Sequence, residues 1–315
     1  MSACPACRSD AVAEAERMPV ERIAAAWARQ DAWAGYDAAD VLARVRADAG
    51  ADSVAFLACA RCGLEFADPP RAWSAANYPP ESYGLAWDHL RALAILRAEA
   101  PLRLLEIGCA DGKFLERAAA LGHGATGIDF SRAAVDAARA RGLDAHVADV
   151  REVRGFAGPE PFGCIALFQV IEHLEAPDEV FDAISAVAAP DARLLVGCPA
   201  DRRYTRRVGH PERIGRSDFW DYPPQHVLRW TPDALRIFLG RHGWRLQSAE
   251  YEPFDAVGAA AHLTGLAGRA GGWIDRPLRR RAATAAYRAR LAAARLRRSM
   301  TGIRLLVVAR REGVE

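Results

Sequence analysis

The chain has 315 residues, of which 51% are hydrophobic and 26% charged, so it can form one large α/β domain with a small appendage. Its net charge of +2 excludes a strong overall attraction to nucleic acid or membranes. Charges interrupt every apolar stretch before the roughly 18 residues that a spanning helix needs, and no basic-then-apolar leader opens the chain. We therefore expect a cytoplasmic globular protein.

Two C-x-x-C pairs dominate the N-terminal region. Cys4 and Cys7 form the first pair, and Cys59 and Cys62 form the second. In a chain without a secretory signal, such pairs indicate metal ligands rather than disulfides. Four thiolates fill a tetrahedral zinc site and leave no open position, so we predict structural Zn²⁺. The three other cysteines lie in apolar runs and are predicted to be buried packing residues: Cys109, Cys164 and Cys198.

The segment between the cysteine pairs predicts a helical insertion. Residues 12–50 are rich in alanine and charge, and Ile23, Trp27 and Ala34 suggest one amphipathic face. Residues 54–57 and 64–66 then predict a short hairpin around the second pair. Prolines at 69–70 and 79–80 end this region. We predict a zinc-ribbon domain over residues 1–80.

Strands and helices alternate in the following region. A helix over 85–99 precedes an alternating series, with strands over 102–107, 125–128, 145–148, 164–168 and 193–198 and helices over 113–121, 132–141 and 178–187. This rhythm predicts an α/β fold, with a Rossmann-like, mainly parallel seven-stranded sheet and helices on both faces. We assign residues 81–315 to this domain.

The pattern loosens after residue 199. Residues 200–228 are irregular, a helix over 232–242 begins after Thr231 as N-cap, and strands are predicted over 245–251 and 303–309. Between them, 254–300 is predicted to be a helical lid or an arginine-rich segment. Arg276 to Arg298 contains nine arginines and no acid. A solvated helix face is the default interpretation, and an anionic acceptor or a membrane surface are alternative partners.

The main functional signal is the stretch LLEIGCADG over 104–112, where an apolar strand leads into small residues and then a helix. Glycines let the backbone approach a ligand, and the helix N-terminus favours a carboxylate nearby. Asp129 follows at the end of the next strand, where it could accept hydrogen bonds from ribose hydroxyls. Gly108 and Gly112 lack the G-x-G-x-x-G frame that admits a pyrophosphate, which argues against a nicotinamide dehydrogenase. A purely structural turn remains the alternative for this loop alone.

Four segments in order resemble motifs of the class I methyltransferases, especially the small-molecule enzymes that include the ubiquinone-type O-methylating group. They are LEIGCADG at 105–112, GIDFS at 127–131, ADV at 148–150 and FQVIEHL at 168–174. The resemblance covers about residues 83–250. It departs from the family pattern at Ala110, where a third glycine is common.

This resemblance implies S-adenosylmethionine as cofactor. Glu106, Gly108 and Gly112 would shape the methionine pocket, and Asp129 would hold the ribose. Asp149 with Val150 would bind the adenine, while Phe168 and Gln169 would line the sulfonium side. Alternatively, Glu106 only braces the loop and Phe168 belongs to the core. The full set of predicted cofactor-binding residues is Glu106, Gly108, Cys109, Asp111, Gly112, Asp129, Phe130, Asp149, Val150, Phe168 and Gln169.

The N-terminal cysteines carry a second resemblance. CPAC followed by CARCGLEF and an Asp-Pro pair is similar to the zinc-binding leader of some sugar and natural-product methyltransferases. The resemblance agrees with the structural zinc inferred from the cysteine spacing. Four unliganded thiols are the alternative.

Methyl transfer to oxygen usually needs a general base, and the candidates are His173, His210 and His226. The segment DYPPQH at 221–226 resembles a P-P-x-H segment that faces the acceptor pocket in related enzymes. We therefore assign His226 as the base, with Tyr222 assisting. His173 is expected to order the pocket wall through a hydrogen bond. A histidine that merely caps or packs is the alternative for His226.

These observations predict an S-adenosylmethionine-dependent methyltransferase that modifies a small molecule. The expected acceptor is a sugar, lipid-linked or secondary metabolite, methylated at oxygen. One alternative is an RNA methyltransferase that holds its substrate with the zinc ribbon and the arginine-rich helix. The low net charge and the absence of an N-P-P-Y-like segment, where FQVI stands at 168–171, argue against it. A second alternative is a non-catalytic cofactor-binding subunit.

Overall fold

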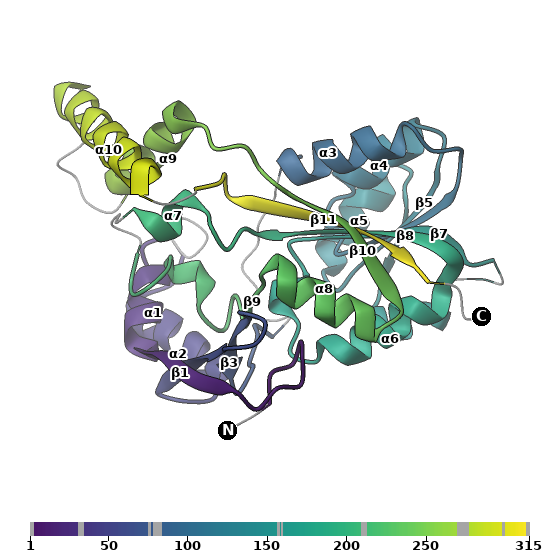
Figure 1. Cartoon of the computed structure of the whole chain (residues 1–315), viewed down its shortest axis with the longest axis horizontal. Coiled ribbons are helices and arrows are strands. Elements are labelled where there is room, and N and C mark those ends of the chain that lie inside the picture. The colour runs from purple at the N-terminus through teal and green to yellow at the C-terminus, as the bar shows by residue number, and fades with distance from the viewer. Residues whose placement is uncertain are drawn as a thin grey trace.

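The structure is a computed structural model of the whole chain (Figure 1). It describes residues 3–30, 35–74, 77, 84–155, 158, 160–208, 213–269, 277–297 and 300–312. Within these ranges, only the backbone of 266–269, 277–279 and 294–297 is described.

A seven-stranded sheet forms the centre of the larger part of the molecule. Its order is β10-β11-β8-β7-β4-β5-β6, and β4 to β8 are parallel, whereas β11 runs antiparallel to both of its neighbours. The predicted Rossmann-like fold is confirmed. The strands are β4 (Arg103–Ile107), β5 (Gly124–Asp129), β6 (Asp144–Val147), β7 (Phe162–Phe168), β8 (Ala188–Pro199), β10 (Trp244–Tyr251) and β11 (Arg304–Arg311).

Helices cover both faces of this sheet (Figure 1). In β7, Cys164 and Ala166 pack on one face, while Ile165 and Leu167 pack on the other, so the strand is apolar on both sides. α3 (Trp87–Leu96) and α4 (Lys113–Ala120) cover the first face. α6 (Pro177–Val187) and α8 (Pro232–Arg241) cover the second, and α5 (Arg132–Ala140) packs beside β6. Short 3₁₀ helices lie in the described connections, among them η2 (Val150–Gly155), η3 (Ile171–His173) and η4 (Phe219–Asp221).

Strand order reverses between β4 and β7. β5 and β6 continue from β4 on one side, and β8 continues from β7 on the other. Parallel sheets bind ligands in the crevice beyond the carboxyl ends of their strands at such a reversal. The predicted motif residues follow the carboxyl ends of β4, β5, β6 and β7, so the topology brings them to one edge of the sheet.

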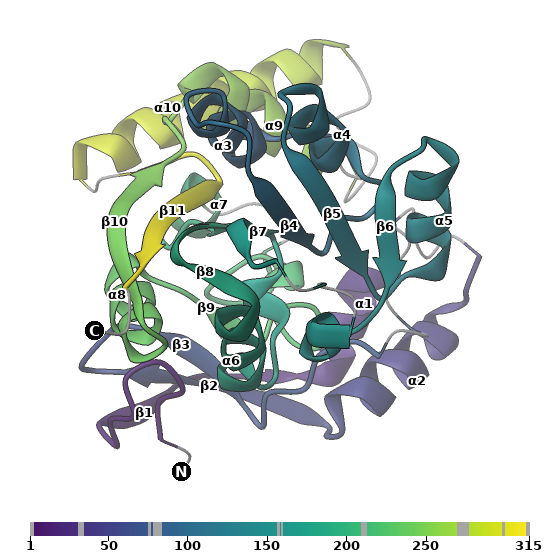
Figure 2. The same ribbon diagram turned by 90° about the vertical axis from the view of Figure 1, so that its right-hand side faces the viewer.

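A second, four-stranded antiparallel sheet is formed by three strands of the N-terminal region and one later strand, and it is called the N-terminal sheet below (Figure 2). It contains β1 (Val12–Pro19), β2 (Ser53–Cys59), β3 (Glu65–Asp68) and β9 (Leu228–Arg229), in that order. The predicted hairpin is confirmed as β2 and β3. α1 (Val20–Trp27) and α2 (Ala38–Ala49) form the helical part of the insertion, whereas Ala34 lies outside the described residues.

The prediction that the insertion is helical from residue 12 is wrong. Residues 12–19 form β1, which pairs antiparallel with β2 along its whole length. Alanine and glutamate are good helix formers, but intrinsic propensity amounts to less than about 1 kcal/mol per residue, so pairing with a neighbouring strand overrides that preference. Pro19 then stands at the N-cap of α1, in extended backbone, and separates the strand from the helix.

The N-terminal sheet is joined to the rest of the chain by β9. Glu65 in β3 pairs with Arg229, and Phe66 pairs with Leu228. The Thr231 hydroxyl donates a hydrogen bond to the carbonyl of Cys62 at 2.8 Å. It also caps α8, as predicted, by accepting a hydrogen bond from the backbone N–H of Ala234 at 3.1 Å. β3 and the second cysteine loop therefore pack directly against β9 and the start of α8, although these segments are far apart in the sequence.

Two C-terminal helices form a small separate layer (Figure 1). α9 (Ala256–Arg269) and α10 (Pro277–Arg297) bury Leu263 and Leu291 against Tyr204 of α7 (Tyr204–Arg207). Within 254–300, where a helical lid or an arginine-rich segment is predicted, the described residues 256–269 and 277–297 form helices. Among the residues that the structure describes, no helix combines the length and apolarity needed to cross a membrane.

Candidate functional site

The loop after β4 depends on two glycines. Gly108 and Gly112 have φ of +73° and +78°, a conformation that glycine adopts without steric cost. A Cβ on Gly108 would lie 2.5 Å from Cγ2 of Val170, and one on Gly112 would lie 2.4 Å from Cδ1 of Leu143. Both positions therefore exclude larger residues, and the loop can follow the sheet edge closely.

Ala110 lies between these glycines and also has a positive φ, of +46°. For an alanine, this left-handed conformation costs roughly 1–2 kcal/mol, which explains why a glycine would suit the position. Its backbone N–H donates a hydrogen bond to Oδ2 of Asp129 at 2.9 Å, and this contact offsets part of the cost. The conformation thus fixes the distance between the loop and the end of β5.

Asp129 braces two loops at the predicted ribose position. Besides the contact with Ala110, Oδ1 accepts the backbone N–H of Ser131 at 2.8 Å. Burial raises the pKa of Asp129, and these two backbone donors oppose the rise. A carboxylate oxygen can accept two hydrogen bonds, so each oxygen can still accept a hydroxyl.

Glu106 brings a second carboxyl group into the same loop. Its side chain is buried, and Oε2 has no hydrogen-bond partner within the described part of the chain. Burial raises the pKa of Glu106 well above its usual range, and the nearby Asp129 and Asp111 add to the rise. A buried polar atom without a partner is costly, so this oxygen is suited to a donor group of a ligand.

The predicted adenine side is open to solvent. The Phe130 side chain is 49% exposed, which is unusual for a phenyl ring and provides a flat apolar surface. Arg151 binds both oxygens of Asp149, at 2.9 Å and 2.6 Å, and this pairing lowers the pKa of Asp149. Such an exposed pair is worth about 0–1 kcal/mol, so Asp149 can exchange partners at low cost. Sequence analysis did not identify Arg151.

Phe168 belongs to the core as much as to the site. It is buried, and its ring lies 4.4 Å from that of His89 and 4.7 Å from that of Phe114. Gln169 follows with a φ of +56°, and its side-chain amide donates to Oδ2 of Asp88 at 3.0 Å. The strained backbone at Gln169 directs this amide toward α3.

Asp88 and His89 of α3 are site residues that sequence analysis missed. Asp88 is fully buried and lies 3.2 Å from Nδ1 of His89 and 3.4 Å from Nε of Arg304. Burial opposes ionisation, but His89, Arg304 and Gln169 together lower the pKa of Asp88. The available signal was the acidic Asp88 on the buried face of α3, whose other buried residues, Ala92 and Leu96, are apolar.

A histidine pair lies beyond β7 on the predicted acceptor side. His226 donates through Nδ1 to Oδ1 of Asp221 at 3.1 Å, and His173 donates through Nδ1 to the Gln225 carbonyl at 2.5 Å. The two rings meet edge to face with centroids 4.8 Å apart. Oε1 of Glu172 lies 4.0 Å from Nε2 of each histidine. Both Nε2 atoms thus approach one carboxyl group.

Burial controls the charges of Glu172, His173 and His226. It lowers the pKa of His173 to about 3, with the neighbouring His226 adding to the effect. It also lowers the pKa of His226, although Asp221 opposes the shift. Burial raises the pKa of Glu172 to about 8. Both histidines are therefore neutral at pH 7, and a neutral imidazole can accept a proton.

Glu172, His173 and His226 could also hold a metal ion, because their ligand atoms all lie within 4.8 Å of one another. Both Glu172 oxygens lack a hydrogen-bond partner among the described side chains and backbone. Glu172 belongs to the FQVIEHL segment, but no role was predicted for it.

Asp221 is the charged centre of the acceptor side. Arg203 binds its carboxylate directly, and Nε of Arg229 lies 3.7 Å from Oδ2. Burial opposes ionisation, but Arg203, His226 and Arg229 together hold the pKa of Asp221 well below its usual range. The negative charge of Asp221 can stabilise a positive charge that develops on His226. No role was predicted for Asp221 either.

Tyr222 points away from this histidine pair. Its hydroxyl donates to Oε2 of Glu16 in β1 at 2.8 Å, and its ring packs edge to face on Phe56 of β2. Tyr222 therefore links the acceptor wall to the N-terminal sheet. His210, the third histidine considered, lies outside the described residues.

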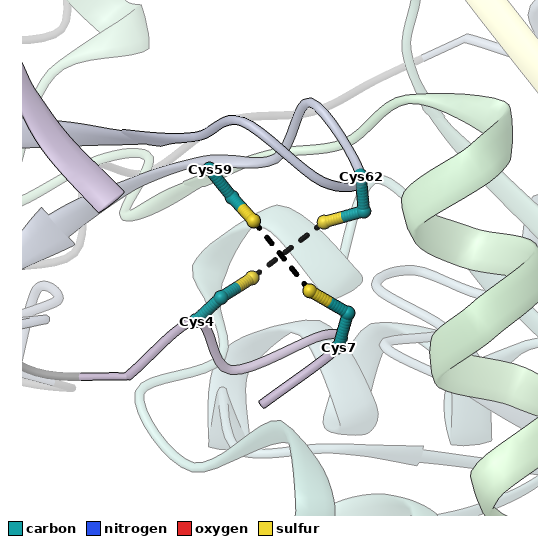
Figure 3. A group of neighbouring side chains, drawn as sticks. All are labelled: Cys4, Cys7, Cys59 and Cys62. Carbon is teal, nitrogen blue, oxygen red and sulfur yellow. Dashed lines mark hydrogen bonds between the residues drawn. The ribbon is translucent and has the colours of Figure 1, made fainter. Parts of the chain in front are cut away.

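The four N-terminal cysteines meet at one point (Figure 3). All four are buried, and all four sulfur atoms lie within 4.8 Å of one another. The Sγ atoms of Cys4 and Cys62 are 3.6 Å apart, and those of Cys7 and Cys59 are 3.5 Å apart. A tetrahedron with zinc–sulfur bonds of 2.3 Å has edges of about 3.8 Å. The thiols are thus arranged as a tetrahedral ion would require, and they are too far apart for disulfides.

The remaining cysteines agree with their predicted packing role. Cys109, Cys164 and Cys198 are buried and form no disulfide.

Comparisons with known proteins agree with this geometry. A family model described as a methyltransferase domain matches residues 81–249. A ubiquinone biosynthesis O-methyltransferase from Caulobacter sp. (strain K31) is 29% identical over 149 residues, which are 46% of this chain and 52% of the relative. A protein of the same name from Hahella chejuensis is 34% identical over 98 residues, 30% of this chain and 41% of that one. The chain thus spans about half the length of the curated relatives it matches.

Solved structures show a more distant likeness. A SAM-dependent methyltransferase from Archaeoglobus fulgidus superposes with a TM-score of 0.47 at 18% identity, covering 71% of this chain and 94% of that one. A second methyltransferase, from Mesorhizobium loti, superposes with a TM-score of 0.45 at 20% identity and covers 71% of this chain and 98% of the other.

Proposed function

Because the chain belongs to the class I methyltransferase-domain family, we propose that it is an S-adenosylmethionine-dependent methyltransferase that acts on a small-molecule acceptor. The observation that carries the proposal is the cradle formed by Gly108, Gly112 and Asp129 at the strand-order reversal. The acceptor we propose is a sugar, lipid-linked or secondary metabolite, and the acceptor atom is an oxygen.

The residues of the cradle fit S-adenosylmethionine. When bound, this cofactor supplies an electrophilic methyl carbon on a sulfonium. Glu106 offers an unpartnered, buried Oε2 to a cationic donor such as an ammonium group, and Asp129 offers its remaining lone pairs to the ribose. Phe130 provides an exposed ring for the adenine, and Asp149 can turn from Arg151 to its amino group.

On the acceptor side, we assign His226 as the general base. The acceptor hydroxyl proton passes to Nε2 of His226, while Nδ1–H stays on Asp221. Asp221 keeps the imidazole in the required tautomer and stabilises the imidazolium that forms. His173 and Tyr222 are positioning residues. His173 holds the backbone at Gln225, and Tyr222 fixes the same segment on Glu16.

We further propose a structural Zn²⁺ on Cys4, Cys7, Cys59 and Cys62 and a division of the chain into a zinc ribbon over 1–80 and a methyltransferase domain over 81–315. Four thiolates leave zinc no open coordination position, so the ion takes no part in catalysis. Its role is to hold both cysteine loops against α8. Arg241, the last residue of this helix, donates to the carbonyls of Pro5 and Ala6 at 2.9 Å and 3.0 Å.

The cofactor assignment can be tested with Asp129→Ala. We expect this variant to weaken binding of S-adenosylhomocysteine by about 100-fold, because hydrogen bonds to a charged group contribute about 1.5–3 kcal/mol each. Isothermal titration of the wild type and the variant gives both affinities. Asp136→Ala, which removes an exposed carboxylate on α5, is the matched control and should bind normally. Equal affinity of wild type and Asp129→Ala, or no binding to the wild type, would contradict the proposal.

We also propose that α10 contacts an anionic surface. Arg280, Arg281 and Arg288 are exposed and line a cavity of about 520 Å³ along this helix. Each basic residue near an anionic membrane contributes about 1 kcal/mol. We therefore expect flotation with vesicles that contain phosphatidylglycerol but not with phosphatidylcholine vesicles, and loss of flotation when the three arginines are changed to glutamine. Absence from the anionic vesicle fraction would exclude this contact.

A further inference from the structure

A cavity of about 310 Å³ lies where β3 and β9 of the N-terminal sheet meet α7. Five arginines line it, together with two acids: Arg206, Arg207, Arg213, Arg216 and Arg229, with Glu65 and Asp201. We call this space the arginine cavity. Its lining residues come from β3 and β9 of the N-terminal sheet and from the segment after β8, so only the folded chain assembles it.

The two acids do not balance the five guanidinium groups. Glu65 is shared by Arg206 and Arg229, each at 2.9 Å, and by Arg216 at 3.3 Å. Asp201 is already held by the Tyr251 hydroxyl, at 2.7 Å. Arg229 also faces Asp221 at 3.7 Å and Glu16 at 4.0 Å, so the positive charge that no described acid balances lies on Arg207 and Arg213.

Two guanidinium groups keep donors for a ligand. The guanidinium of Arg207 forms no hydrogen bond or ion pair with any residue that the structure describes. The guanidinium of Arg213 donates only through Nε, to the Gly215 carbonyl at 2.8 Å. Arg206 is largely buried, and both burial and the neighbouring Arg203 lower its pKa. Crowded like charges destabilise one another, so a bound anion would relieve this repulsion.

The arginine cavity adjoins the proposed base. Arg229, which lines it, donates through Nε and Nη2 to the backbone carbonyl of Asp221 at 3.1 Å and 2.8 Å. Asp221 in turn holds His226. Arg229 thus connects the cavity lining directly to Asp221, the residue whose carboxylate orients the proposed base.

We infer that the arginine cavity binds a phosphate group carried by the methyl acceptor. This inference rests on the proposed function and narrows its substrate class to phosphorylated or phosphodiester compounds. Guanidinium groups form charge-assisted, bidentate hydrogen bonds with phosphate. Here they converge from α7, from residues 213–216 and from β9, which matches a tetrahedral anion with several oxygens. A planar carboxylate needs only one such fork.

The test is isothermal titration of inorganic phosphate, pyrophosphate and acetate into the full-length protein, alongside S-adenosylhomocysteine. We expect saturable binding of phosphate and pyrophosphate, with acetate at least tenfold weaker. Arg207→Gln/Arg213→Gln should weaken phosphate binding at least tenfold and leave S-adenosylhomocysteine binding unchanged. Arg236→Gln, which removes an exposed arginine of α8 outside the cavity, is the matched control and should bind phosphate normally.

The outcomes separate this inference from the proposed function. A wild type that binds S-adenosylhomocysteine but no phosphate overturns the inference alone. Equal phosphate affinity in the double variant and in the control also overturns it, as does acetate binding as strong as phosphate binding. Phosphate binding without any S-adenosylhomocysteine binding overturns the proposed function, and the assignment of the phosphate to a methyl acceptor with it.

Discussion

Removing the zinc ion proposed for the cysteine cluster is expected to unfold the N-terminal ribbon and to abolish the proposed methyl transfer. Zinc bound by a thiolate cluster contributes roughly 10–16 kcal/mol of folding free energy in small zinc domains, as much as the total stability of many proteins. Without zinc, the four thiols would be buried without a ligand, although their sulfur atoms lie only 3.5 Å and 3.6 Å apart across the cluster. Cys4→Ser/Cys62→Ser should therefore lose zinc and lower the melting temperature by at least about 10 °C.

The measurement combines metal analysis by mass spectrometry with thermal unfolding of the purified protein. Cys164→Ala is the matched control, because it removes a buried thiol of the central sheet outside the cluster. This control should keep one zinc per chain and lose only about 1 kcal/mol of stability. A purified wild type without zinc, or a double serine variant as stable as the wild type, would exclude the structural metal.

His226→Gln is expected to lower turnover by about 10²–10⁴-fold, the usual contribution of a general base. Glutamine has a similar size but its amide cannot act as a base at neutral pH, so turnover should fall while binding of S-adenosylhomocysteine should not change. The measurement is kcat with an acceptor found by screening, together with cofactor affinity by titration. His262→Gln on α9, a histidine that contacts Tyr204, is the matched control and should keep most of the turnover.

The pH profile provides an independent test of His226. Because burial lowers the pKa of His226 in the folded protein, the imidazole stays neutral below the usual histidine range. Turnover should therefore hold its plateau at pH 6.5 and fall only at lower pH, where the base becomes protonated. In His226→Gln this acidic limb should disappear. Near-normal turnover in the variant would contradict the assignment, and turnover that requires an added divalent cation would assign the histidine pair and Glu172 to metal binding.

The sequence was sufficient to predict the central sheet, because apolar runs mark β4, β7 and the second half of β8. Gly108 and Asp129 could be found because they lie at the carboxyl ends of β4 and β5, where parallel sheets bind ligands, and Gly112 follows in the same loop. The helix cap at Thr231 was equally local. These features depend on a few neighbouring residues, so periodicity and spacing reveal them.

The missed features depend on partners far away in the chain. Strand β1 forms because β2 lies beside it, which its alanine-rich sequence does not indicate. Asp88 meets Gln169, and Glu16 meets Tyr222, across 81 and 206 residues. No local pattern encodes such pairs. For the same reason, spacing alone could not show that Asp221 lies between His226 and two arginines.

The strand β9 has a consequence for how this protein could diversify. Leu228 and Arg229 complete the N-terminal sheet, although they follow the acceptor-side histidine by only a few residues. Recombination that exchanged the first 80 residues alone would replace β3 without its partner strand and would separate Glu65 from Arg229. A viable chimera must therefore inherit residues 221–241 with its ribbon. The proposed ribbon and residues 221–241 would thus be exchanged together, and that segment contains His226, the proposed base.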